Sequence, residues 1–141
     1  MKARSVKGNS PGEINAALSV CQADGFQPTL AILFISVKQD RNAVCELLTR
    51  QGIDVVGATS AGEFTEGHES TGEIALILLD ISKSDYCILL ERFDERTEEE
   101  AAAILAKKAL EKFKRPAFIL CSSFFFSGWE SGQWRSIGTK L

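Results

Sequence analysis

The residues best suited to chemistry lie in one short stretch, Val55–Glu63, with the sequence VVGATSAGE. Its threonine and serine offer hydroxyl groups that donate and accept hydrogen bonds, and its two glycines permit tight backbone turns that leave N–H groups exposed. The stretch follows a predicted strand, and open α/β sheets bind their ligands at this edge. We therefore expect a site for a small polar ligand, formed by Gly57, Thr59, Ser60, Ala61, Gly62 and Glu63.

Acidic residues around this stretch indicate which ligands it would take. No Lys or Arg lies between Arg50 and Lys83, whereas six acidic residues do: Asp54, Glu63, Glu66, Glu69, Glu73 and Asp80. A loop that binds phosphate normally has a Lys or a free helix N-terminus nearby, and residues 64–72 have no apolar helical face to supply one. Phosphate and nucleotides are disfavoured, and we expect an amine or another cationic group to meet Glu63, with Thr59 and Ser60 as hydrogen-bonding partners. The plain alternative is that the glutamates belong to a solvated loop.

An enzymatic interpretation of the same stretch is weaker. Ala58–Gly62 approximates the G-x-S-x-G nucleophile elbow, with Ala in place of the first Gly. That elbow requires a helix directly after it, and none is predicted there. His68 is the one histidine of the chain and lies in the same loop. Because a hydrolase needs serine, base and carboxylate within hydrogen-bonding reach, we expect no catalytic residues and no enzyme activity.

The cysteines indicate neither a metal site nor disulfides. They are far apart, lie among apolar residues and form no Cys-x-x-Cys pair: Cys21, Cys45, Cys87 and Cys121. Zinc sites usually show two closely spaced pairs of ligands. We expect buried thiols that behave as small apolar side chains, and we expect no metal and no cofactor.

Strand and helix signals alternate along the chain and must position the candidate site. Helices are expected from the Ser10/Glu13 capping box to about Asp24, between the cap Asp40 and Gly52, and from the Thr97/Glu100 capping box to about Lys114. Strands are expected at residues 2–6, 29–35, 53–59, 73–80, 85–93 and 117–121.

The order of these elements determines the fold class. Two successive strand–helix–strand units imply a parallel sheet with right-handed crossovers. The link at residues 81–84 is too short for a crossover, so it implies an antiparallel pair. The prediction is an α/β fold with a mixed β-sheet, in the order β-α-β-α-β-β-β-α-β, with helices packed on the sheet.

Residues 122–141 break this regularity. They contain three consecutive phenylalanines and both tryptophans, with neither strand nor helix periodicity. We expect an α/β domain at residues 1–121 followed by an irregular tail at residues 122–141. Two explanations of the tail stay open, a frayed terminus and a truncated or frame-shifted remnant of a longer protein.

Length and charge exclude several classes of protein. The 141 residues are 45% hydrophobic and 25% charged, with a net charge of −3, which suits one globular domain and lacks the basic surplus of a general nucleic-acid-binding protein. The longest apolar run, Ile74–Leu79, is far shorter than the ~20 residues that span a bilayer, and the basic start lacks the apolar segment of a secretory signal. We expect a cytoplasmic location, with neither nucleic acid nor membrane as a partner.

The stretch Val56–Glu63 also resembles a known family. Its sequence, VGATSAGE, is similar to the G-x-T-S-A-G-E signature of the FIST-type sensory domain of bacterial and eukaryotic signalling proteins. The resemblance covers residues 1 to about 121 and is to the N-terminal half of the FIST module. It implies an intracellular sensory domain, with small molecules such as amino acids as proposed ligands. Some members resemble haem-binding sensors, but here only His68 could serve as an axial ligand.

The function expected is therefore an intracellular sensory domain of signal transduction that binds a small, amino-acid-like ligand and is incomplete relative to its family. The alternative is a ligand-free interaction fragment that pairs through its exposed sheet edge, or a non-functional truncated remnant. The expected partners are the small-molecule ligand and either a signalling protein or a second copy of the chain.

Overall fold

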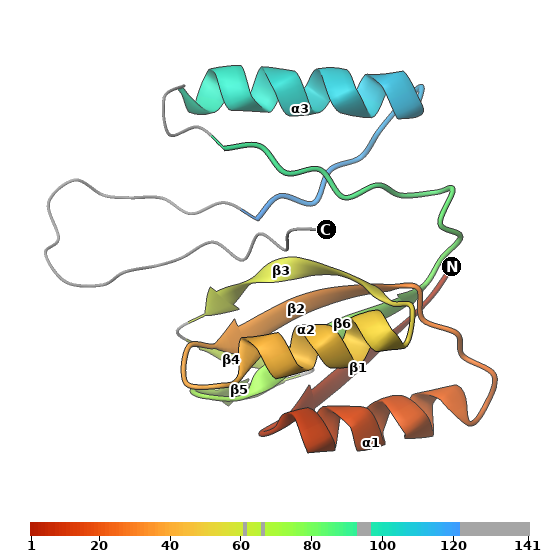
Figure 1. Ribbon diagram of the computed structural model, residues 1–141, viewed down its shortest axis with the longest axis vertical. Helices are drawn as coiled ribbons and strands as arrows, with labels where there is room; N and C mark the ends of the chain where they lie inside the picture. The colour runs from red at the N-terminus through yellow and green to blue at the C-terminus, as the bar shows by residue number, and fades with distance from the viewer. Residues whose placement is uncertain (61, 66, 93–96, 122–141) are drawn as a thin grey trace, which may run out of the picture.

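The computed structural model describes residues 1–60, 62–65, 67–92 and 97–121. The elements within these residues are shown in Figure 1 and are β1 (Lys2–Gly8), α1 (Pro11–Gln22), β2 (Leu30–Ser36), α2 (Arg41–Arg50), β3 (Asp54–Ser60), β4 (Glu63–Thr65), β5 (His68–Ser70), β6 (Ile74–Asp80) and α3 (Glu98–Lys112). The α/β fold class with a mixed sheet and three helices is confirmed.

Four of the strands form the main sheet, in the order β1-β6-β2-β3. β2 and β3 are parallel and are connected by α2, as the strand–helix–strand pattern predicts. β6 is antiparallel to both of its neighbours, β1 and β2. β6 and β2 therefore occupy the centre of the sheet, which fits their nearly continuous apolar sequences.

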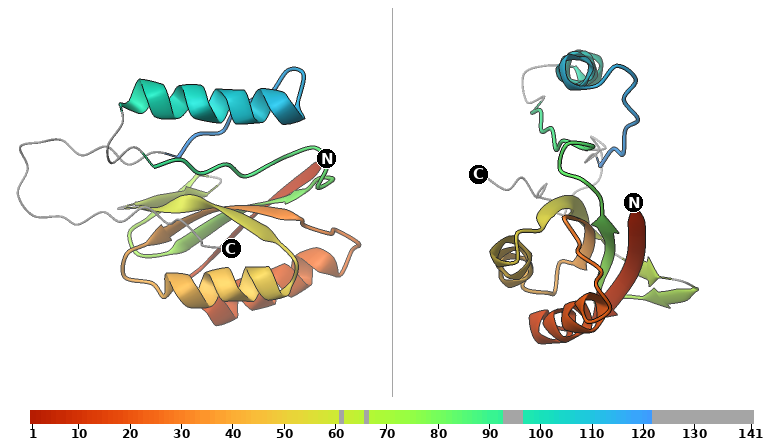
Figure 2. Two further views of the ribbon diagram at one scale, coloured as in Figure 1. Left: turned by 45° about the horizontal axis from the view of Figure 1, so that its top comes forward. Right: turned by 90° about the vertical axis from the view of Figure 1, so that its right-hand side faces the viewer.

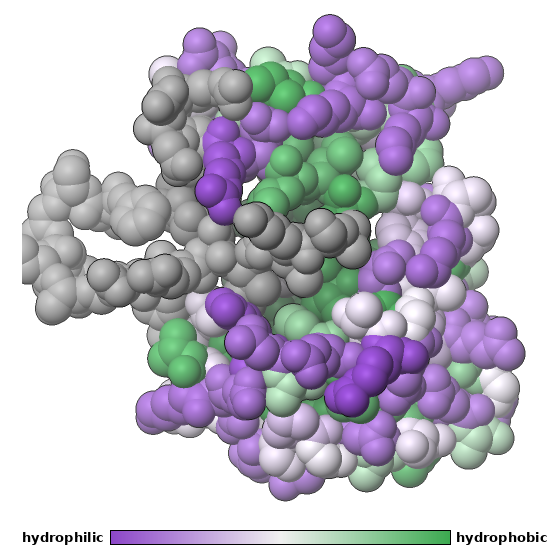
Figure 3. Space-filling view, in the orientation of Figure 1, coloured by the Kyte–Doolittle hydropathy of each residue, from purple (hydrophilic) through white to green (hydrophobic). Residues whose placement is uncertain are grey.

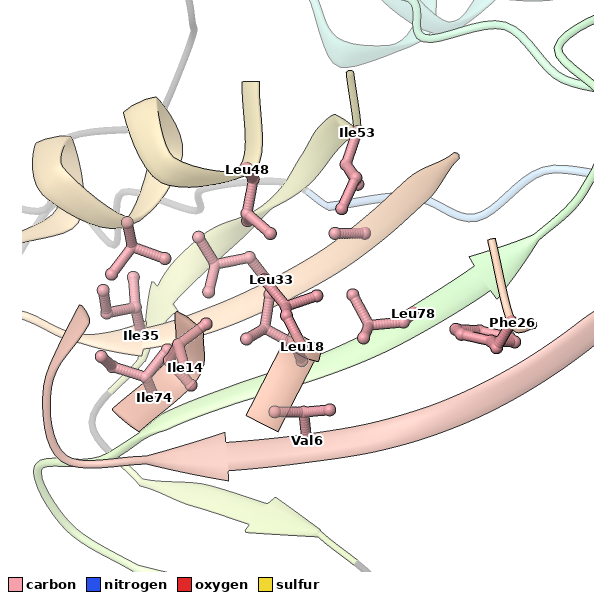
Figure 4. Packing of buried hydrophobic residues seen from close by; sticks show 13 residues of the cluster. Val6, Ile14, Leu18, Phe26, Leu33, Ile35, Leu48, Ile53, Ile74 and Leu78 are labelled. Carbon is pink, nitrogen blue, oxygen red and sulfur yellow. The ribbon is translucent and has the colours of Figure 1, made fainter. Parts of the chain in front are cut away.

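The main core lies between this sheet and the helices α1 and α2, which cover one face of it (Figures 1 and 4). Leu18, Leu33, Leu48 and Leu78 are each at most 1% exposed. The core residues of each strand occupy alternate positions, because successive side chains point to opposite faces of a sheet. The apolar residues between them consequently form a second apolar face.

Two of the helices begin at the serine and threonine caps that the sequence predicts. In α3 the capping box is complete: Thr97 Oγ1 accepts from the Glu100 N–H (3.2 Å), and the Glu100 carboxylate accepts from the Thr97 N–H (2.9 Å). In α1 Ser10 Oγ accepts from the Glu13 N–H (3.2 Å). The Glu13 carboxylate, however, accepts from the N–H of Asn9 (2.8 Å), one residue earlier than a capping box requires.

The strands expected at residues 85–93 and 117–121 do not form in the described part of the chain. The first was expected to pair with the preceding strand, β6, but both edges of β6 are already paired with β1 and β2. The chain after Asp80 therefore finds no free edge on β6 and leaves the sheet. A hairpin that the sequence analysis did not predict, β4–β5, forms a separate two-stranded sheet.

α3 lies on the opposite side of the main sheet from α1 and α2 (Figure 2). Residues 81–92 lead to it, and residues 113–121 return from it. Both segments pass between α3 and the sheet in each view of the molecule. The chain therefore has a second, smaller layer above the face that α1 and α2 leave open.

A hydrogen-bonded cluster fixes the start of this layer to the amino ends of β2 and β3. The Tyr86 hydroxyl donates to Asp54 Oδ2 (2.7 Å) and to the Thr29 carbonyl oxygen (2.9 Å), and Lys83 Nζ lies 3.1 Å from Asp54 Oδ2. Burial, together with the bond to the carboxylate, raises the pKa of Tyr86 to about 12. The same bond from Tyr86 lowers the pKa of Asp54.

Candidate ligand-binding site

The carboxyl ends of β2 and β3 lie side by side, because these parallel strands pair from Leu30 with Asp54 to Ser36 with Ser60. A hollow of about 320 Å³ lies at this edge. It is lined by Ser36, Val37, Gln39, Asp40, Arg41, Asn42 and Thr59. Ligand sites usually measure ~300–1,000 Å³, so the hollow is at the lower end of this range, and it lies at the edge where open α/β sheets bind their ligands.

Hydrogen bonds fix the loop between β2 and α2, which forms most of the hollow. The Lys38 N–H donates to Ser36 Oγ (3.3 Å), and the Gln39 N–H donates to the Ser36 carbonyl oxygen (3.0 Å). The segment before β6 is hydrogen-bonded to this loop. Gln39 Nε2 donates to the Gly72 carbonyl oxygen (2.7 Å), and the Ser36 N–H donates to the Glu73 carbonyl oxygen (3.1 Å). The side chains of the hollow therefore extend from a fixed backbone.

Charges of both signs meet at the start of α2. Asp40 is the predicted helix cap, and its Oδ1 accepts from the Ala43 N–H (3.0 Å). The carboxylate thereby occupies the position that a bound anion would take at this helix N-terminus. Arg41 follows directly, and its guanidinium lies 3.5 Å from Asn42 Oδ1. The hollow can thus offer a carboxylate, a guanidinium and an amide to one ligand.

Gly57 lies within β3 and not in the turn that we expected from the sequence. Its neighbour on β2 is Leu33, and a Cβ atom on Gly57 would lie 1.8 Å from the Leu33 carbonyl oxygen. Glycine is needed here because another backbone approaches too closely for any side chain. The absence of a side chain lets β2 and β3 pair at this point, two residues before Thr59.

Among the predicted site residues that the structure describes, Thr59 lines the hollow. Ser60 ends β3 opposite Ser36, at the same edge. The residues of the hollow that come from the β2–α2 loop were not among those predicted from the sequence. A signal for them was available, because Asp40 was identified as a helix cap after a strand, and the residues that follow a parallel strand lie at the ligand-binding edge.

The rest of the predicted site lies beyond the hollow or outside the described residues. Gly62 is exposed, and a Cβ atom there would meet only the Ser70 carbonyl oxygen at 3.7 Å, an ordinary contact. Ala61 and the side chain of Glu63 are not among the described parts of the chain, although the Glu63 backbone begins β4. The assignment of a ligand amine to Glu63 stays a prediction.

No nucleophile elbow is present around Ser60 in the described residues. After Gly62 the chain enters the hairpin β4–β5, where Gly67 occupies the turn with a φ of +81°. His68 begins β5. The elbow needs a strand followed at once by a helix, so that the serine hydroxyl is presented above the sheet. The strand that follows here does not provide that geometry.

Comparison with known families decides what kind of domain this is. The family model of the FIST N domain matches residues 29–138, which include β2, the signature stretch and α3. The chain belongs to the FIST N domain family. FIST domains are sensory, ligand-binding domains linked to signal transduction, and the resemblance noted at Val56–Glu63 is confirmed.

The extent of the match adds two facts about this FIST N domain. β1 and α1 precede the matched residues, and the match continues beyond residue 121 into the stretch expected to be an irregular tail, whose structure lies outside the described residues. Searches among curated proteins and solved structures found no match.

The remaining features of the described residues concern membranes, metals and thiols. No helix among these residues is long and apolar enough to cross a bilayer, and no three His, Cys, Asp or Glu side chains among them could hold a metal ion together. Burial raises the pKa of the Cys45 thiol. Cys121 is exposed, contrary to the expectation of buried thiols, because residues 117–121 do not join the sheet.

Proposed function

We propose that this FIST N domain is a non-enzymatic sensory domain that binds a small, amino-acid-like ligand in the hollow at the carboxyl ends of β2 and β3. The observation that carries the proposal is the presence of Asp40 and Arg41 at successive positions of a hollow of about 320 Å³. An α-amino acid carries a carboxylate and an ammonium group on the same carbon atom. Groups of opposite charge that line the same hollow can pair with both of them.

Each polar group of such a ligand has a partner in the proposed site. Arg41 would hold the ligand carboxylate, because a guanidinium can donate two parallel hydrogen bonds to it. The ammonium group has two candidate partners, Asp40 in the hollow and Glu63 at the start of β4. Thr59 and Ser60 supply hydroxyl groups at the end of β3.

The carboxylate assignment is tested by calorimetric titration of the purified chain with a panel of amino acids. Arg41→Gln is expected to weaken binding by about 10- to 100-fold, because a hydrogen bond to a charged group contributes ~1.5–3 kcal/mol. Arg50→Gln removes the same charge at the other end of α2 and is the matched control, with an unchanged Kd expected. Equal Kd values for the two variants would remove Arg41 from the site.

The ammonium assignment needs two variants that preserve the fold. Asp40→Asn removes the negative charge and keeps a side-chain oxygen that caps α2. Glu63→Gln is its counterpart in β4, and the variant that loses affinity identifies the partner of the amine. A ligand at 100 times its Kd stabilises the folded chain by ~2.7 kcal/mol, so a thermal-shift screen in which no amino acid raises Tm would refute the proposed function.

A further inference from the structure

Apolar side chains are concentrated on the side of the main sheet that faces α3. On this side Phe34 of β2 and Ile77 of β6 are 39% and 44% exposed, although both strands are central. The segments beneath α3 add the exposed side chains of Ile88, Leu90, Phe118, Ile119 and Leu120. Figure 3 shows apolar residues gathered between the charged surface of α3 and the sheet below it. An apolar surface of this kind, bordered by charged residues, is typical of a binding surface.

The most exposed part of this surface is the segment Ala117–Cys121, with the sequence AFILC. All five of its residues are exposed, and Ile119 and Leu120 are 70% and 75% exposed. The segment is extended and belongs to no strand, although phenylalanine and isoleucine favour strands. Among the described residues its backbone N–H and C=O groups have no hydrogen-bonding partner. Another strand could satisfy these groups and cover the side chains.

We propose that two copies of the chain associate by pairing residues 117–121 as antiparallel strands about a twofold axis at Ile119. In this register Ile119 faces the second copy's Ile119, and Phe118 faces its Leu120. An antiparallel strand pair is self-complementary, as the interface of a symmetric dimer must be. No like charges oppose one another, because the segment carries no charge. This association goes beyond ligand binding and does not depend on it.

The charges of α3 favour a second copy over another partner. The first turn of the helix holds Glu98, Glu99 and Glu100. Its second half holds Lys107, Lys112 and one glutamate, Glu111, together with Lys108, which already pairs with Glu91 of the same chain (2.8 Å). Residues 113–121 run beneath α3 in the opposite direction (Figure 1). Antiparallel pairing of the two segments therefore sets the two α3 helices antiparallel as well. The acidic start of each helix then lies toward the basic half of the other, and the two helix dipoles are opposed.

Sedimentation equilibrium over a range of concentrations tests the proposal, with a monomer–dimer equilibrium expected for the wild type. Ile119→Lys places two like charges opposite each other and removes two isoleucines from the interface. It is expected to raise the dimer Kd by roughly a hundredfold or more. Val20→Lys changes an equally exposed residue (73%) on α1 and should leave the Kd unchanged. Both variants should give the circular dichroism spectrum of the wild type, which checks that they are folded.

A mixture of two variants tests the register. Ile119→Lys and Ile119→Glu are each expected to be monomeric, and an equimolar mixture of them should form a heterodimer, because opposite charges then face each other at the twofold axis. Each of four results would overturn the proposal: a monomeric wild type, an Ile119→Lys protein that dimerises like the wild type, a mixture that stays monomeric, and assemblies of no fixed size.

Discussion

Replacing Gly57 with alanine would place a methyl group 1.8 Å from the carbonyl oxygen of Leu33. Cβ atoms essentially never approach another atom more closely than 3.0 Å, so β2 and β3 must separate by about 1.2 Å at this point. Hydrogen bonds between strands are ~2.9 Å long, and a stretch of this size breaks them. The loss of about two or three such bonds, at ~1 kcal/mol each, lowers the free energy of unfolding by about 2–3 kcal/mol.

The substitution Gly57→Ala also has a stabilising effect on the free energy of unfolding, but this effect is smaller than the loss of hydrogen bonds. Alanine restricts the unfolded chain more than glycine does, which stabilises a protein by ~0.4–1 kcal/mol where the folded backbone accepts the side chain. Gly62 provides the matched control within the same signature, since a Cβ atom there would meet only the Ser70 carbonyl oxygen at 3.7 Å. Gly62→Ala should therefore change the free energy of unfolding by no more than about 0.5 kcal/mol.

Urea unfolding followed by circular dichroism measures both variants. With an m value of ~1–3 kcal/mol/M, the midpoint of Gly57→Ala should fall by about 0.7–3 M, and that of Gly62→Ala should stay close to the wild-type value. Equal midpoints for the two variants would refute the conclusion that Gly57 is required by the close approach of β2 and β3.

Three further predictions concern packing, capping and the Tyr86 cluster. Leu18→Ala, at a position that is 0% exposed, should lower the free energy of unfolding by ~2–5 kcal/mol, whereas Val20→Ala on the same helix should change it by less than ~0.5 kcal/mol. Thr97→Ala should destabilise α3 by ~1 kcal/mol, measured as faster hydrogen exchange of its first amides. Tyr86→Phe should lower stability by about 1–2 kcal/mol at neutral pH, because the hydrogen bond to Asp54 is lost. Since folding raises the pKa of Tyr86 from 10.0 to about 12, the stability that Tyr86 contributes is complete below pH 10 and disappears as the pH rises through 12. Tyr86 is the single tyrosine of the chain, so its ionisation can be followed by absorbance, and a midpoint near 10 in the folded protein would contradict the prediction.

Most of the fold could be predicted because its signals are local. Ser10, Asp40 and Thr97 each begin a helix, and a glycine or polar segment ends each apolar run. The order of strands could not be predicted in the same way. β6 lies between β1 and β2, and this arrangement depends on pairing between residues 39 or more positions apart in the chain, such as Gly8 with Ile74 and Ile35 with Ile74. Once β6 is paired on both sides, residues 85–92 have no place beside it.

The candidate site was predicted only in part, for a similar reason. Thr59, which the sequence placed at the end of a strand, does line the hollow. Asp40 and Arg41, at the start of α2, were not predicted to line it, because the parallel pairing of β2 and β3 brings the two segments together. Gly57 was expected in a turn but lies within β3, because a glycine required by a turn and one required by a neighbouring backbone look alike in a sequence. The distinction depends on Leu33, which is 24 positions away.

The position of Gly57 also limits what a loss of ligand binding would mean. Thr59 and the loop after Ser36 form one hollow while β2 and β3 stay paired, and the Leu33 backbone leaves no room for a Cβ atom at Gly57, two residues before Thr59. A Gly57 variant is therefore expected to lose affinity even if the glycine never touches a ligand. Gly62 has room for a side chain, so lost binding in Gly62→Ala without lost stability would show direct contact with the ligand. Only a loss of binding in Gly62→Ala at unchanged stability would extend the site beyond the hollow into the rest of the signature.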